Sequence, residues 1–511
     1  MNRRKFLSTS AAVGTLTIVP RSVLGKGFIP PSDKVSIVNI GCGWQGHSEI
    51  EALLRCPHVE VVGVADPNKQ SNTYVGFGSV DAMRNSIRRL IDEPTWLEGV
   101  TGHPGGRDVM KYVIETYYKK HRPGYTGTIA AEEDWRELLE KVRDVDAVKI
   151  ISSDHTHSYI SVDCFKRGKH QVMHKPLGNK LHEAMKVVDM ATANPKLATF
   201  FSAYSTAQPS GINLTKAWID AGAIGKLREI HNWTNRPVWV QYADIPTERA
   251  PIPRGFNWDL WLGPSQWREF SPKYTFSTFR GWYEFGAGAI ADMGMYSMIS
   301  VFEVLELGAA ISASTRFARA YSIDLDLCQR QVSNTWSFPL AAGYRFEVPY
   351  KNGSGTVLYT WHDGGMKPNV PFGFPDDDLP REGMMFIGEK GIIYCNFYGD
   401  NPRLMGLSDA DMRRYSRITA PSRPFMREDA SEGTIRWLHH WLEDVKGTSQ
   451  KKNPGSFEYI SALNQTYNLG AVSLMSNGKK LLYDSATRRI TNDEEANKLL
   501  HRDTRRGWEF V

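Results

Sequence analysis

The stretch Val35–Asp66, VSIVNIGCGWQGHSEIEALLRCPHVEVVGVAD, decides the fold. Its first apolar run ends in glycines spaced as G-x-G-x-x-G, at Gly41, Gly43 and Gly46, and an amphipathic segment follows. A second apolar run then stops at Asp66, twenty residues beyond Gly46. This order predicts a strand, a glycine turn, a helix, a second strand and a terminal acid, which is the pattern of a dinucleotide site.

Each part of this motif has a physical task. Gly41 allows the tight turn, Gly43 lets the backbone approach a pyrophosphate, and Gly46 lets the helix pack close to the strand. Free N–H groups at the helix start face the phosphates, and the Asp66 carboxylate accepts hydrogen bonds from ribose hydroxyls. The expected cofactor contacts in this stretch are Gly41, Cys42, Gly43, Trp44, Gln45, Gly46 and Asp66. A carboxylate at Asp66 repels a 2′-phosphate, so we expect NAD, with NADP possible.

Length and composition indicate an ordinary globular protein of two or three domains. The chain has 511 residues, of which 41% are hydrophobic and 23% charged. Its net charge is +6, but four of these positive charges lie in residues 1–25, which contain no acid. Basic patches interleaved with aromatic residues are absent from the sequence. We therefore expect neither nucleic acid nor an acidic membrane surface as a partner.

The first 25 residues have the layout of a twin-arginine export signal. Arg3 and Arg4 precede Phe6 and Leu7, and a mildly apolar stretch of small residues follows. That stretch is too short and too rich in Ser and Thr to span a bilayer. Export by this route carries folded proteins, so we expect a periplasmic enzyme that acquires its nucleotide before export.

The five cysteines are odd in number and show no metal-ligand spacing.

An alternating α/β rhythm extends from the glycine motif to about residue 205. Residues 70–130 interrupt it and are interpreted as an insertion that carries two helices. Strands are expected at Ala147–Ile151, His170–Met173 and Leu197–Tyr204, which predicts a doubly wound, six-stranded parallel sheet in a domain of residues 33–205. Ligands of such sheets bind at the carboxyl ends of the strands. The segments Ser152–His157 and His174–Pro176 should therefore face the nicotinamide half of the cofactor.

From residue 206 to 511 the pattern changes to a second α/β domain with a large, mostly antiparallel sheet. Alternating runs at Leu227–Trp233, Tyr344–Val348 and Thr356–Thr360 predict its strands, and helices are expected at Glu432–Lys446 and Ser456–Met475. Six tryptophans fall in one short window, at positions 233, 239, 258, 261, 267 and 282. They are interpreted as core, with a sugar-stacking platform as the alternative.

The order of these motifs resembles the Gfo/Idh/MocA oxidoreductase family over nearly the whole chain after the signal. The matching pieces are GCGWQG, VADP at Asp66, SSDHTHSYI, GKHQVMHKPL around Lys175, WDLWLGP at Trp258–Pro264, FRGWYEFGAGAIADMG at Phe279–Gly294 and NDEEANKLL. The resemblance implies a Rossmann domain, an NAD(P)-dependent reaction at a hydroxyl carbon of a sugar or glycoside, and a homodimer or homotetramer assembled through the open face of the second sheet.

The resemblance also implies the catalytic residues. Lys175 holds the place of the family lysine that contacts cofactor and substrate and assists proton transfer. Asp292 and Tyr296 hold the places of an aspartate and a histidine one helical turn apart. The sequence departs from the family at Tyr296 and at His174, where glutamate is usual. The proton acceptor therefore stays open among Lys175, Tyr296 and a nearby histidine.

The remaining site residues come from the same resemblance. Ser152, Asp154, His155, His157 and His174 are expected to line the cofactor. Trp261, Arg280, Asn235 and Arg236 are expected to bind the sugar. His155 and His157 lack a third metal ligand at a sensible spacing, so we expect no metal.

Three functional interpretations follow. The first is a sugar or glycoside dehydrogenase. The second is a glycosidase that oxidises the sugar, eliminates the aglycone, adds water and reduces again with one bound NAD. The third is a sugar-binding relative that has lost turnover.

Overall fold

The computed structural model describes most of the chain. The described residues are 29, 33–74, 79–206, 209–237, 242, 244–318, 321–323, 326–331, 334–350, 355–371, 374, 378–420, 433–450 and 452–510. The predicted export signal, residues 1–25, lies outside them, as does Trp239.

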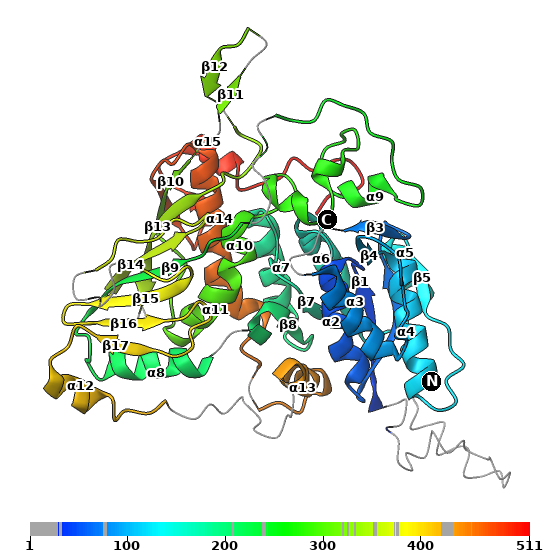
Figure 1. The fold of residues 1–511 in the computed structure, drawn as a ribbon, viewed down its shortest axis with the longest axis horizontal. Coiled ribbons are helices and arrows are strands. Elements are labelled where there is room, and N and C mark those ends of the chain that lie inside the picture. The colour runs from blue at the N-terminus through cyan, green and yellow to red at the C-terminus, as the bar shows by residue number, and fades with distance from the viewer. Residues whose placement is uncertain are drawn as a thin grey trace.

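The first unit is a six-stranded parallel sheet of order β5-β2-β1-β6-β7-β8 (Figure 1). Its strands are β1 (Val35–Ile40), β2 (Val59–Ala65), β5 (Ala130–Glu132), β6 (Ala147–Ile150), β7 (His170–Met173) and β8 (Thr199–Phe201). β1 and β6 are almost wholly buried, as strands of a parallel sheet covered on both faces must be, and the sequence accordingly shows continuous apolar runs there. The predicted doubly wound fold is confirmed.

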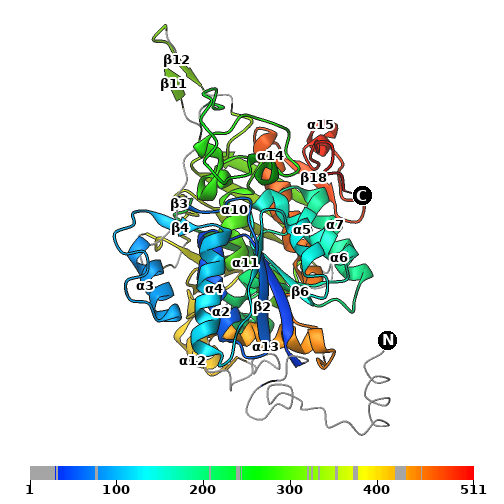
Figure 2. The same cartoon turned by 90° about the vertical axis from the view of Figure 1, so that its right-hand side faces the viewer.

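Helices cover both faces of this sheet. They are α2 (Trp44–Arg55), α4 (Arg107–His121), α5 (Trp135–Lys141), α6 (His157–Lys166) and α7 (Leu181–Ala193). Figure 2 shows α2 and α4 on one face of the sheet and α5, α6 and α7 on the other. Because successive strands connect through these helices, all their carboxyl ends meet at one edge. The glycine turn, Asp66, Ser152 and His174 follow four of those ends.

The segment predicted as an insertion has two parts. The first holds β3 (Ser71–Tyr74), α3 (Val80–Ile91) and β4 (His103–Gly105), and β3 pairs with β4 outside the main sheet. The second is α4, which contacts both β2 and β5 and so is the crossover helix between them. β5 has only three residues, which explains why no strand was predicted there.

The second unit is a nine-stranded, mostly antiparallel sheet, also as predicted. Its strands are β9 (Leu227–Trp233), β10 (Ser312–Phe317), β13 (Ala342–Tyr350), β14 (Gly355–His362), β15 (Gly383–Gly388), β16 (Ile392–Cys395), β17 (Arg403–Met405), β18 (Leu481–Asp484) and β19 (Arg489–Ile490). β9 and β14 form its parallel pair. A two-stranded hairpin, β11 (Tyr321–Ile323) and β12 (Gln329–Gln331), projects from the molecule (Figure 1).

Helices separate the two sheets. They are α10 (Gly288–Asp292), α11 (Gly294–Val304) and α14 (Ser461–Met475), which lie between the second sheet and α7 in Figure 1. The other helices are α8 (Pro209–Asp220), α9 (Trp258–Leu262), α12 (Asp409–Tyr415), α13 (Gly433–Lys446) and α15 (Glu494–Lys498). One cluster of buried apolar side chains runs through both units, which fixes the second unit against the carboxyl edge of the first.

Candidate active site

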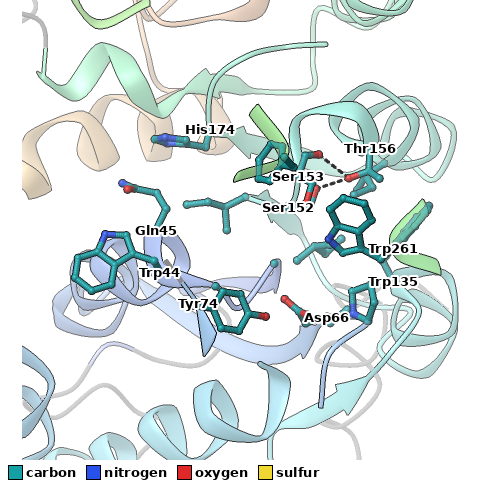
Figure 3. Close-up of a pocket in the computed structure, with 18 of the residues that line it drawn as sticks. Trp44, Gln45, Asp66, Tyr74, Trp135, Ser152, Ser153, Thr156, His174 and Trp261 are labelled. Atoms are coloured by element: carbon teal, nitrogen blue, oxygen red, sulfur yellow. Dashed lines mark hydrogen bonds between the residues drawn. The ribbon is translucent and has the colours of Figure 1, made fainter. Parts of the chain in front are cut away.

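A cavity opens where the carboxyl edge of the parallel sheet meets α9–α11 (Figure 3). The space inside it is about 1130 Å³, which includes solvent at its open mouth. Twelve of the predicted site residues line it: Gly41, Gly43, Trp44, Gln45, Asp66, Ser152, His174, Lys175, Trp261, Arg280, Asp292 and Tyr296. The tertiary structure thus brings together both halves of the predicted site.

The glycine turn forms a cradle whose tight backbone path has no room for larger residues. Gly41 has φ +103°, and a Cβ there would come within 2.4 Å of the Ile151 carbonyl oxygen. A Cβ on Gly46 would lie 2.6 Å from the Gly41 carbonyl oxygen. The first turn of α2 has no side-chain cap and no acidic residue. Its N-terminus at Gly43 and Trp44 lines the cavity, which suits a pyrophosphate.

Replacing Gly46 with alanine is expected to push α2 away from the turn. The 2.6 Å contact is with rigid backbone, so the helix must move, at a cost of about 1–3 kcal/mol in the free energy of unfolding. Dinucleotide affinity should fall as well, because the N–H groups shift from the phosphates. Denaturant unfolding and calorimetric titration with NAD measure both effects. Gly308→Ala is the control, because a Cβ there meets Pro349 at an ordinary 3.5 Å. Unchanged affinity in Gly46→Ala would contradict the cradle.

Asp66 closes the other end of the cradle. Its Oδ2 accepts a hydrogen bond from the Cys42 N–H at 2.7 Å, and its Oδ1 accepts one from the Asn68 N–H at 2.8 Å. A carboxylate has about four acceptor positions, so it can still accept from ribose hydroxyls. Burial raises the pKa of Asp66 to about 6, against the hydrogen bonds to its oxygens, which lower it.

Lys175 and Asp292 form a buried ion pair at the opposite end of the cavity. Both side chains are 3% exposed, and the Lys175 Nζ donates to Asp292 Oδ1. Arg280 Nε lies 3.5 Å from the same oxygen, and an Arg236 nitrogen lies 3.9 Å from Oδ2. Burial, and then the charge of Arg280, lowers the pKa of Lys175 well below its usual range. A lysine so placed is suited to proton exchange or to donating a hydrogen bond to a developing oxyanion.

Tyr296 does not share an unbroken helix with Asp292. The sequence predicted both on one helical face, but α10 ends at Asp292 and α11 begins at Gly294. Both side chains still line the cavity. The Tyr296 hydroxyl lies 3.0 Å from His174 Nε2. The two positions at which the chain departs from the family pattern are therefore in direct contact.

Several predicted cofactor ligands lie behind the cavity wall. His155 and His157 are fully buried and hydrogen-bond backbone carbonyls, His155 to Trp261 and His157 to Pro176 and Ser152. Burial lowers the pKa of His155 to about 3 and also lowers that of His157. The His155 ring is therefore neutral, and both rings hold the wall in place. Asp154 also supports the wall, because its Oδ1 lies 3.7 Å from an Arg280 guanidinium nitrogen.

The other predicted residues take supporting positions. The buried Cys42 and Gly46 belong to the turn but do not line the cavity. Asn235 and Arg236 follow β9 and are also not lining residues, although Arg236 reaches Asp292. Among the residues that the structure describes, no cluster of three or more potential metal ligands occurs, and no helix is long and apolar enough to cross a bilayer.

The tryptophan window is mainly core, as interpreted from the sequence. Trp258, Trp261 and Trp282 belong to one buried aromatic cluster, and Trp258 stacks on Trp261 with ring centroids 5.1 Å apart. Trp233 packs in a different cluster, and Trp267 is 57% exposed. Trp261 fits both the core interpretation and the sugar-stacking alternative, because it packs in the buried cluster and also lines the cavity.

Sequence reasoning missed several lining residues. They are Tyr74, Glu133, Trp135, Ile160, Leu260 and Phe279, among others. Figure 3 shows Tyr74 near Asp66 and places Trp135 and Trp261 on the side opposite Trp44 in that view. Ser153 and Thr156 also line the cavity and belong to the segment Ser152–His157, which was predicted to face the nicotinamide. Leu260 and Phe279 adjoin predicted residues, so their proximity was a usable signal. Tyr74 and Trp135 carry no motif that marks them.

Comparison with protein families finds two matches within the chain. Residues 110–201 match the model described as the oxidoreductase family, NAD-binding Rossmann fold. Residues 222–312 match the model for the C-terminal alpha/beta domain of the same family. Parts of both units therefore match domain models of the Gfo/Idh/MocA oxidoreductase family, and the first unit has the NAD-binding Rossmann fold. A comparison with curated protein sequences finds no match.

Solved structures share this fold at low sequence identity. An oxidoreductase from Thermotoga maritima aligns with a TM-score of 0.50 and 15% identity, over 89% of this chain and 100% of that one. Levoglucosan dehydrogenase in complex with NADH and levoglucosan has a TM-score of 0.49 and 14% identity, over 88% and 100%. The WlbA dehydrogenase from Bordetella pertussis, with NADH and UDP-GlcNAcA, has a TM-score of 0.49 and 11% identity, over 88% and 99%. At such identities the likeness concerns the fold.

Proposed function

We propose that this protein is an NAD(P)-dependent oxidoreductase that transfers a hydride between the nicotinamide and a hydroxyl carbon of a sugar or glycoside. The observation that carries this proposal is the continuity of one cavity. It joins the glycine cradle and Asp66 to the buried Lys175 and Asp292 and to the half-buried Tyr296. A dinucleotide held at the first end presents its reactive ring to proton-handling side chains at the second.

The residues present fit the cofactor. The glycine cradle brings the start of α2 to the cavity for a pyrophosphate, by a tight turn in which a Cβ at Gly41 or Gly46 would collide with backbone. Asp66 accepts the ribose hydroxyls of NAD. When bound, the nicotinamide supplies hydride transfer. The chain's own residues hold it, exclude water with Trp261 and Phe279, and exchange the hydroxyl proton at Lys175 or Tyr296. Asp292 and Arg280 fix the charge around Lys175.

NAD affinity should weaken as pH falls below about 6. The pKa of Asp66 is raised by burial to about 6, and a ribose hydroxyl donates best to the ionised carboxylate. Protonation therefore competes with binding, and Kd rises up to about tenfold for each pH unit below 6. Titration of nucleotide-free protein at pH 7.5 and pH 5 measures this. Asp66→Asn, which cannot titrate, should bind more weakly with a flat profile. Equal affinity of the parent protein at both pH values would contradict the role of Asp66.

We also propose export and self-association. The twin-arginine pattern in residues 1–25 supports a periplasmic location. In β13, Arg345 and Glu347 are exposed whereas Phe346 and Val348 are buried, so this part of the second sheet has one solvent-facing side. That side is the proposed interface of a homodimer or homotetramer. Light scattering of the mature protein, and fractionation of cells that express the full chain, test both proposals.

The deciding experiment for function is absorbance and mass analysis of the purified protein before and after addition of monosaccharides and aryl glycosides. We expect bound nucleotide and the absorbance band of reduced nicotinamide after one class of sugar is added. Release of aryl alcohol without net reduction would instead identify the redox glycosidase. Bound nucleotide that no sugar reduces would identify a sugar-binding relative. Absence of nucleotide, with no binding of added NAD or NADP, would refute the proposal.

A further inference from the structure

A chain of hydrogen bonds leads from the cavity into the protein through Tyr296. The Tyr296 hydroxyl lies 3.0 Å from His174 Nε2, and His174 Nδ1 lies 2.8 Å from Glu49 Oε1. Tyr296 is half-buried and lines the cavity, whereas His174 is 4% exposed. These three residues come from α11, the end of β7 and α2, so the chain crosses the boundary between the two units.

Glu49, at the far end of this chain of hydrogen bonds, determines which of its atoms carry protons. Burial raises the pKa of Glu49, but the charge of Lys149 and the hydrogen bonds from His174 and Lys149 bring it well below its usual range. An ionised carboxylate only accepts hydrogen bonds, so His174 Nδ1 carries a proton. Burial lowers the pKa of His174 to about 4, so the ring is neutral and Nε2 is an acceptor. The Tyr296 O–H therefore donates to His174 Nε2.

Glu49 is held firmly in this role. Lys149, whose side chain is fully buried in β6, forms an ion pair with Glu49 Oε2. Gln45 donates to Glu49 Oε1 at 2.9 Å from one helical turn away, and Figure 3 shows Gln45 pointing toward His174. Ser202 Oγ lies 3.0 Å from His174 Nδ1. These contacts fix the orientation of the His174 ring, in which Nε2 faces Tyr296 and Nδ1 faces Glu49 and Ser202.

We propose that Tyr296 is the acid–base residue of the site and that His174 and Glu49 form the proton relay behind it. The inference rests on the proposed function. In the oxidation direction the substrate O–H proton passes to Tyr296 Oη as the tyrosine proton passes to His174 Nε2. The substrate C–H bond breaks with its electron pair as hydride to the oxidised nicotinamide, and the carbon–oxygen double bond forms. His174 becomes an imidazolium whose Nδ1–H faces the Glu49 carboxylate.

This assignment leaves Lys175 a different task. Its Nζ is bound to Asp292, and it lies 5.4 Å from the centre of the Tyr296 ring. As a hydrogen-bond donor that lines the cavity, Lys175 stabilises negative charge on the substrate oxygen. The relay instead moves the proton from Tyr296 to His174, beside the Glu49 carboxylate. Tyr296 is the catalytic residue here, and His174 and Glu49 are positioning residues.

The charged groups around the relay come from several elements. The groups whose electrostatic interaction shifts the pKa of Tyr296 are Glu49, Arg280, Tyr398 and Arg236. The groups that shift the pKa of His174 in the same way are Glu49, Lys175 and Lys149. Glu49 is the nearest carboxylate to the ring, and its charge raises the pKa of His174. Removing that charge makes the imidazolium harder to form.

The test combines a structural readout with kinetics. The structural readout is ¹⁵N nuclear magnetic resonance of histidine-labelled full-length protein, with the His174 signals assigned by their loss in His174→Gln. We expect a neutral ring with its proton on Nδ1. In kinetics, Tyr296→Phe should retain bound nucleotide and lose about 10²–10⁴-fold in kcat. Glu49→Gln should lose about 10–100-fold in kcat at nearly constant KM. The control is Glu51→Gln on the same helix, because Glu51 pairs with the exposed Arg55.

The outcomes separate the relay from the proposed function. If the protein turns over a sugar but His174 carries its proton on Nε2, the relay is overturned and the proposed function stands. The same holds if the protein turns over a sugar and Tyr296→Phe keeps full activity. No turnover with any sugar, despite bound nucleotide and the expected Nδ1 proton, overturns the proposed function and the catalytic role of Tyr296 with it. The resonance measurement needs no active variant, so it decides the relay geometry even if Glu49→Gln does not fold.

Discussion

Replacing Lys175 with methionine is expected to lower kcat by about 10²–10³-fold, the usual effect of removing one donor from a developing oxyanion. Lys175 lines the cavity beside Asp292 and Tyr296, and no bulk solvent reaches its 3% exposed side chain. Water therefore cannot replace its hydrogen bond to the substrate oxygen. KM for the sugar should change less than kcat, because the interaction strengthens as negative charge develops.

The Lys175→Met protein should still fold. Removing one partner of a buried ion pair usually leaves a costly unpaired charge. Here Arg280 lies 3.5 Å and Arg236 3.9 Å from the Asp292 carboxylate, so positive charge stays beside it. Steady-state kinetics and unfolding measurements on the same preparation distinguish the two effects.

Lys169→Met is the matched control for Lys175. Lys169 precedes β7, the strand that Lys175 follows, and its Nζ donates to the carbonyls of Arg143 and Val145 at 2.8 Å. It therefore lies at the amino edge of the sheet, away from the cavity. Its replacement should leave kcat unchanged. A Lys175→Met enzyme as fast as the parent would remove Lys175 from the chemistry.

Replacing Arg502 with methionine is expected to lower the free energy of unfolding by about 3–5 kcal/mol. Arg502 follows α15 and its side chain is 1% exposed. Its guanidinium donates to Glu183 on α7 at 2.6 Å, to Ser265 at 3.0 Å and to the Glu284 carboxylate at 2.9 Å. The substitution leaves the buried Glu183 carboxylate and the partly exposed Glu284 carboxylate without this partner. Denaturant unfolding at a fixed, saturating NAD concentration measures the loss.

Arg502 also holds the walls of the site. Ser265 follows α9, which carries Trp261, and Glu284 precedes α10, which carries Asp292. Arg502→Met should therefore weaken sugar binding as well as stability. Arg489→Met is the control, because the Arg489–Glu494 pair is 59% and 73% exposed and such pairs contribute little. Equal stability of the two variants would show that the buried network is not needed to join the units.

Local pattern determined much of the nucleotide end. The glycine turn, Asp66 and the strands β1, β2, β6 and β7 fall where apolar runs and their terminal residues predicted them. Each signal lies within a few residues of the feature it specifies, and the position of a parallel strand fixes where its carboxyl end lies. Lys175, Asp292 and Tyr296 were found through the family resemblance, because nothing in their local spacing specifies chemistry.

Only the tertiary structure decided what surrounds those residues. Glu49 carries no motif that marks it, yet it meets His174, which is 125 residues further along the chain. His155 and His157 looked like ligands, yet folding turns their ring nitrogens toward backbone carbonyls. Arg502 carries no motif at all. Such contacts form between segments far apart in sequence, where burial makes each unpaired polar group costly, and no local period in the chain records which partner will satisfy it.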